Sequence, residues 1–148
     1  MANSRHYAIV QYVAALLIAA PAIAGGRVYE GLDYAMPPDA VSQVHVLLDA
    51  VDDPDASLMF PNAPIDWTDH FTVVIKARRS GTDPAEKVAD AVWTDVYARV
   101  LADRTFGGLL ELFTPGGVAP DRDQADTDVA LLTWRFTVLH RTTDNSIA

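Results

Sequence analysis

One segment near the C-terminus constrains the fold more than any other. From residue 132 to residue 141, every second side chain belongs to a largely apolar series, and these side chains are Leu132, Trp134, Phe136, Val138 and His140. A period of two over ten residues is typical of a β-strand that buries one face. The residues that follow, 142–148, are mostly polar, and we expect them to fray.

Two further strands are expected upstream. Residues 70–78 repeat the alternation, with one side formed by Phe71, Val73, Ile75 and Ala77. Residues 44–48 alternate in the same way, and a short extended piece is expected at 27–29. A sheet of at least three strands therefore needs a cover for its apolar face.

A helix is expected between the strands at 70–78 and 132–141. Asp83 suits the N-cap, Pro84 the first helical position, and Glu86 can complete a capping box. An apolar face with helical spacing continues to about Asp103, formed by Ala85, Val88, Ala89, Val92, Trp93, Val96 and Val100. We expect this face to pack on the sheet.

Two segments are expected to be loops. Residues 49–66 combine several Asp residues with three prolines, and a loop of this length is often functional. Residues 105–127 hold two Gly-Gly pairs, two prolines and several acids, with a short extended piece expected at 109–113.

The first 26 residues admit three interpretations. As a signal peptide, they have a weakly basic start, an apolar middle and an Ala22-Ile23-Ala24 cleavage site. As a membrane helix, the apolar run barely reaches the required length. As a helix of the folded domain, residues 1–24 show amphipathic spacing, can be capped by Asn3 or Ser4 and stop at Pro21. We favour the third interpretation.

Together these elements predict an α+β fold, with a small mixed or antiparallel sheet packed against two amphipathic helices and long loops. The length of 148 residues fits a single domain, 1–148.

Composition narrows the classes of function. Without cysteine, the chain has no disulfides, thiolate metal sites or thiol nucleophiles. The net charge of −9 opposes nucleic-acid binding as the main task. No phosphate-binding, nucleophile-elbow or zinc-protease motif is present, so we expect neither an enzyme nor a cofactor.

No metal site is expected. The acidic segments starting at Asp53 and Asp121 lack the glycine and the final glutamate of a calcium-binding EF-hand loop. His6, His45, His70 and His140 form no close pair in the sequence. His45, His70 and His140 lie on or beside expected strands and could meet in a sheet. The simpler interpretation is that they are strand residues that bind no metal.

A series of segments carries a family resemblance. In order, they are Asp66-Trp67-Thr68, the strand to Arg78, Arg79-Ser80-Gly81, the helix ending in 96–103, Thr105-Phe106-Gly107-Gly108-Leu109, an acidic loop and Val138–Thr143. This order resembles the tail terminator proteins of long-tailed bacteriophages, the family of minor tail protein U and tail completion proteins. The resemblance covers residues 66–143, with a looser likeness in the N-terminal helix and residues 26–29. The acidic loop 49–66 does not match the family pattern.

The resemblance implies a structural virion protein rather than an enzyme. Such proteins form a ring, usually a hexamer, that caps the head-proximal end of the tail tube, stops its polymerisation and offers a head-joining surface. The implied partners are other copies of the chain, the tail tube protein and a head-completion or connector protein, without a membrane. The implied location is the virion tail, after assembly in the host cytoplasm.

Three alternatives stay open: another phage neck or connector protein, a secreted or periplasmic binding domain if residues 1–24 are cleaved, and an unrecognised hydrolase. If the chain forms a ring, basic side chains are candidates for contacts between subunits or with the tube, because the 11 cations of each chain are expected to pair with some of its 20 acids. The candidates are Lys76, Arg78, Arg79, Arg99, Arg104, Arg135 and Arg141. We expect genome DNA to pass through such a ring without tight binding.

Overall fold

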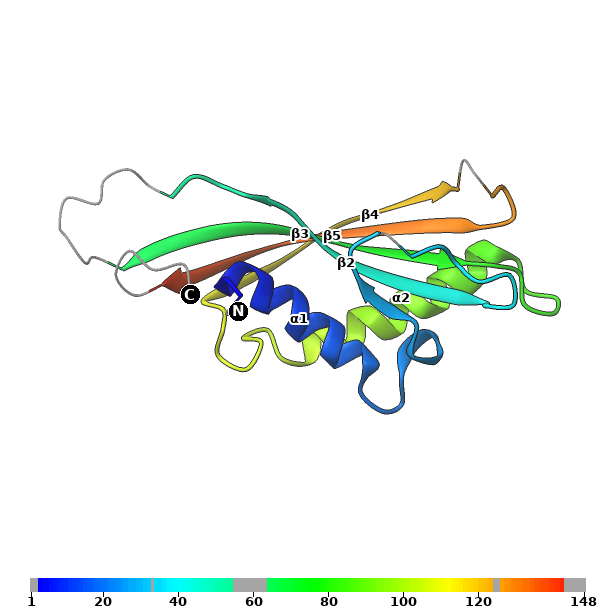
Figure 1. Ribbon diagram of the computed structural model, residues 1–148, viewed down its shortest axis with the longest axis horizontal. Coiled ribbons are helices and arrows are strands. Elements are labelled where there is room, and N and C mark those ends of the chain that lie inside the picture. The colour runs from blue at the N-terminus through cyan, green and yellow to red at the C-terminus, as the bar shows by residue number, and fades with distance from the viewer. Residues whose placement is uncertain (1–2, 33, 55–63, 124–125, 143–148) are drawn as a thin grey trace.

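The computed structural model describes residues 3–32, 34–54, 64–123 and 126–142. Within these residues, five strands form one sheet in the order β1-β2-β3-β5-β4. β1 runs parallel to β2, and every other neighbouring pair is antiparallel. Two α-helices lie together on one face of the sheet (Figure 1). The expected α+β class, with two helices packed on a small mixed sheet, is confirmed.

Several strands are longer than the sequence predicts. The strands are β1 (Val28–Glu30), β2 (Ser42–Val51), β3 (Ile65–Ala77), β4 (Leu112–Arg122) and β5 (Ala130–Thr142). The helices are α1 (Arg5–Ile18) and α2 (Ala85–Ala102), with a short 3-10 helix η1 (Ile23–Gly26). β2 and β3 therefore extend into both ends of the segment expected to be an acidic loop. Residues 55–63 of that segment, and the expected frayed tail beyond Thr142, lie outside the described residues.

The central pair of strands, β3 and β5, forms the floor of the core. Phe71 and Phe136 are directly opposite each other across the pair, and their rings stack with centroids 5.4 Å apart. Val73 faces Trp134 in the same register. All four side chains are buried, as the alternation in both segments predicts.

α1 is an integral part of this core. Ser4 caps it, because its Oγ accepts the N–H of Tyr7 at 3.4 Å. Ile9, Val13 and Leu17 have no exposed surface, whereas Leu16 is only partly buried. α1 covers β1 and β2, and cleavage after Ala24 would remove this cover. The helix is nevertheless shorter than the expected 1–24.

No helix among the described residues is both long enough and apolar enough to cross a membrane.

α2 spans nearly the residues that the sequence predicts, but the capping at its N-terminus differs. Pro84 is the N-cap and makes no side-chain capping bond. Asp83 instead accepts a hydrogen bond from Lys87, with 2.7 Å between its Oδ1 and the lysine Nζ. The predicted capping box is therefore wrong, and an exposed ion pair within the first turn takes its place.

β4 is the largest correction, because most of it falls in a segment expected to be loop. Its pairing with β5 shifts register between Pro115 and Val118, so a bulge absorbs the glycine pair between them. A Cβ at Gly116 would lie only 2.6 Å from the Arg135 carbonyl oxygen, so the backbones approach too closely for any other residue. β4 is an edge strand, and all of its residues except Phe113 are exposed.

Candidate functional site

Three side chains that are distant in the sequence meet inside the molecule. The Asp69 Oδ2 atom lies 2.9 Å from the His6 Nδ1 atom and 2.9 Å from the His140 Nε2 atom. The two imidazole nitrogens are 3.2 Å apart. Asp69 and His140 have no exposed surface, and 11% of the His6 side chain is exposed.

The fold explains why these three residues meet. His6 lies in the first turn of α1, which begins beside the end of β5 (Figure 1). Asp69 precedes Phe71 by two residues, and His140 follows Val138 by two, so both continue the apolar side of their strands. The ring of Trp67 lies edge-on to His6, with centroids 5.0 Å apart, and helps to enclose the group.

The other two strand histidines do not join this cluster. On the opposite face of the sheet, His45 Nδ1 donates to the Gly31 carbonyl at 2.7 Å, and its Nε2 accepts from Gln43 at 2.9 Å. Burial lowers the pKa of His45, which keeps this ring neutral and suits both bonds. His70 lies nearer the surface, where its Nε2 is 2.9 Å from Asp52.

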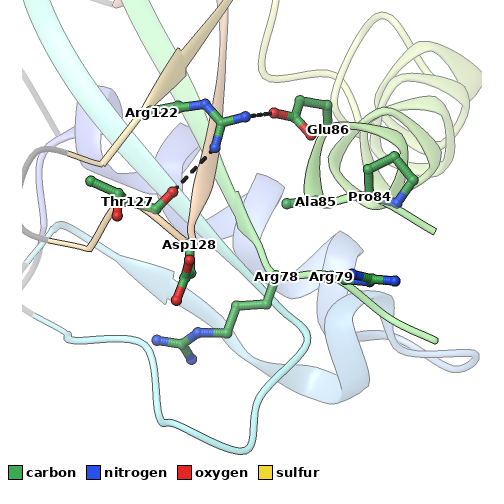
Figure 2. A pocket seen from close by; sticks show the side chains of 8 residues that line it. All are labelled: Arg78, Arg79, Pro84, Ala85, Glu86, Arg122, Thr127 and Asp128. Carbon is green, nitrogen blue, oxygen red and sulfur yellow. Dashed lines mark hydrogen bonds and ion pairs between the residues drawn. The ribbon is translucent and has the colours of Figure 1, made fainter. Parts of the chain in front are cut away.

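A second feature is a cleft at the other end of the sheet. It has a volume of about 450 Å³ and is lined by Arg78, Arg79, Pro84, Ala85, Glu86, Arg122, Thr127 and Asp128 (Figure 2). Arg122 donates to Glu86 and to the Thr127 carbonyl across the cleft. Acids therefore accompany the arginines, and the cleft is not a purely basic site.

The structure separates the seven candidate cations into two groups. Three are already bound within the chain: Arg78 to Asp126 at 2.7 Å, Arg141 to both carboxylate oxygens of Asp66, and Arg99 to carbonyls at the end of α1. The pKa of Asp66 and that of Asp126 are both lowered, mainly by the hydrogen bond from the arginine. Within the described residues, no ion pair joins the other four to an acid; these are Lys76, Arg79, Arg104 and Arg135.

Sequence reasoning missed two parts of this picture. Arg122, which lines the cleft, was not among the candidate cations. The buried cluster was missed because Asp69 lies 63 residues from His6 and 71 from His140. One signal in the sequence could have indicated the cluster. Asp69 and His140 each occupy a position on the apolar side of a long strand.

No protein-family model and no curated protein sequence matches this chain. A chain in a solved structure, the virion of a native gene transfer agent particle, does match its fold. The match has a TM-score of 0.61 and covers 90% of this chain and 95% of that chain, with 14% sequence identity. At this identity, the likeness shows a shared fold over nearly the whole of both chains.

Proposed function

We propose that this chain is a structural protein of a phage-like virion and that it serves as the tail terminator. The observation that carries the proposal is the fold shared, over nearly its full length, with a chain of a gene transfer agent virion. The order of segments between residues 66 and 143, which resembles tail terminator proteins, supports the same role independently. In this role the chain caps the head-proximal end of the tail tube and stops its growth.

A ring requires each subunit to offer two different, complementary surfaces. β4 is a good candidate for one of them, since it lies at the edge of the sheet and exposes Leu112 at 57% and Val118 at 36%. Pro115 and Pro120 interrupt the row of backbone donors along this strand. We therefore propose that a second copy contacts β4 through side chains rather than by adding a strand.

Electrostatics suggests how the second surface is recognised. Four cations without an acidic partner among the described residues, Lys76, Arg79, Arg104 and Arg135, are available for contacts between subunits or with the tube. Because each subunit has a net charge of −9, any neighbouring copy offers many carboxylates. Such pairs set orientation and specificity more than they add affinity.

The proposed partners are further copies of the chain in a hexamer, the tail tube protein and the head-joining protein. DNA passes through the ring without tight binding. The proposed location is the head-proximal end of the tail, reached after assembly in the host cytoplasm.

Removal of the chain from its particle tests this function. We expect tubes of irregular and excessive length that fail to join heads, with normal length restored by the wild-type chain. Leu112→Lys should fold normally but fail to restore tube length, whereas Asp90→Asn, at an exposed position on α2, should restore it. Tubes of normal length without the chain would refute the terminator role.

A further inference from the structure

The buried cluster of His6, Asp69 and His140 has the geometry of a metal site. Each nitrogen is 2.9 Å from the Asp69 Oδ2 atom, and the nitrogens are 3.2 Å apart. A tetrahedral Zn²⁺ ion bound at about 2.0–2.2 Å by two imidazoles and one carboxylate holds its ligand atoms roughly 3.3–3.6 Å apart. The three atoms therefore have to move apart by roughly 0.1–0.7 Å to share one tetrahedral ion.

The charge of the cluster also calls for a cation. Asp69 is fully buried, and within the described part of the chain its only charge partners are the two histidines. A buried carboxylate is costly unless a positive charge balances it. Either a proton on an imidazole or a metal ion must supply that charge.

We infer that His6, Asp69 and His140 bind one divalent cation of the zinc class. Two imidazole nitrogens and one carboxylate oxygen suit Zn²⁺ better than Ca²⁺ or Mg²⁺, which prefer all-oxygen sites. The fourth position is filled by water on the side of His6, whose side chain alone of the three reaches the surface. The ion fastens the start of α1 to β3 and β5, so its role is structural.

Cobalt titration of the full chain, purified without a histidine tag and treated with a chelator, tests the inference. We expect one equivalent of Co²⁺ to produce the visible absorption of a four-coordinate site, and Zn²⁺ to abolish it by displacement. The thermal unfolding midpoint should rise with added Zn²⁺, because an ion that binds only the folded chain stabilises it.

Variants show whether these three residues are the ligands. Asp69→Asn and His140→Gln should each weaken Co²⁺ binding. The loss of affinity should exceed the ~10–100-fold that is typical when a residue hydrogen-bonded to a ligand is replaced. His70→Gln is the matched control, because His70 also lies on β3 and contacts an aspartate, but belongs to no group of three possible ligands among the described residues. It should leave binding unchanged.

Two results would overturn the inference. The first is a wild-type chain that shows no such absorption and no Zn²⁺-dependent stabilisation, which would leave hydrogen bonds alone to hold the three side chains together. This measurement needs no variant, so it holds even if the variants fail to fold. The second is equal loss of binding in His70→Gln, which would place the ion at the surface.

Discussion

The guanidinium of Arg99, on α2, donates a hydrogen bond of 2.8 Å to the carbonyl of Ala19, just beyond the end of α1. It also contacts the carbonyls of Leu16 and Pro21. The last carbonyls of a helix have no partner within it, and a cation there also suits the helix dipole. One side chain thus joins the two helices and satisfies the end of α1, which gives Arg99 a structural role.

We predict that Arg99→Met lowers the free energy of unfolding by about 1–3 kcal/mol, because it leaves several carbonyls without their charged donor. Urea denaturation measures the change. The matched control is Arg79→Met, since Arg79 is exposed and, in the part of the chain that the structure describes, binds only the nearby Gly81 carbonyl. The control should change stability by less than ~0.5 kcal/mol. Equal effects of the two variants would contradict the role given to Arg99.

Leu17 tests whether α1 belongs to the core. The side chain has no exposed surface, so Leu17→Ala should cost about 2–5 kcal/mol through lost burial and a cavity. Leu16→Ala, one position along the same helix and only partly buried, should cost clearly less. Chemical denaturation of the two variants checks this ranking. A larger loss of stability in Leu16→Ala than in Leu17→Ala would contradict the burial of Leu17 in the core.

The sequence predicted those elements whose residues follow a regular pattern. β5 and α2 were found because Trp134 and Phe136, or Val96 and Val100, recur with the period of a strand or a helix. β4 was missed because Pro115 and its glycines are typical of loops, and only pairing with β5 makes this segment a strand. Pairing of this kind depends on residues far away in the chain, which local patterns do not reveal.

The candidate sites show the same limit. Charge and composition singled out the arginines, but not which of them already pair within the chain. Arg141 and Asp66 are opposite each other only because β3 and β5 run antiparallel in this register. Long-range register, rather than residue type, decides which charges remain available.

Asp103 should make stability depend on acid pH. Hydrogen bonds from the Thr105 hydroxyl and from the Gly107 and Thr105 backbones lower its pKa from 3.8 to about 2. A carboxylate with a lowered pKa stabilises the fold above its unfolded pKa, and this stabilisation is lost as pH falls through the folded value. Asp103→Asn should therefore be less stable than wild type at neutral pH.

The test compares thermal unfolding midpoints of wild type and Asp103→Asn between neutral pH and pH ~2. The difference should stay constant down to about pH 4 and shrink as pH falls further. Other acids affect both proteins alike, so the comparison isolates this residue. A difference that does not change with pH would show that the charge of Asp103 contributes nothing.

DNA binding is predicted to be weak. The net charge is −9, and two of the arginines that line the cleft, Arg78 and Arg122, already contact Asp126 and Glu86. A gel-shift titration with duplex DNA at near-physiological salt should show no complex at micromolar protein. Tight binding that falls steeply with added salt would show that Lys76 and its neighbouring arginines outweigh the net charge.

Electron cryo-microscopy of intact particles that contain this chain would show where in the particle it lies and whether it forms a ring. We predict six copies in a closed ring at the head-proximal end of the tail tube, with β4 of each copy against its neighbour. Density for the chain elsewhere in the particle, in the neck without contact to the tube, or in no ring at all would contradict it.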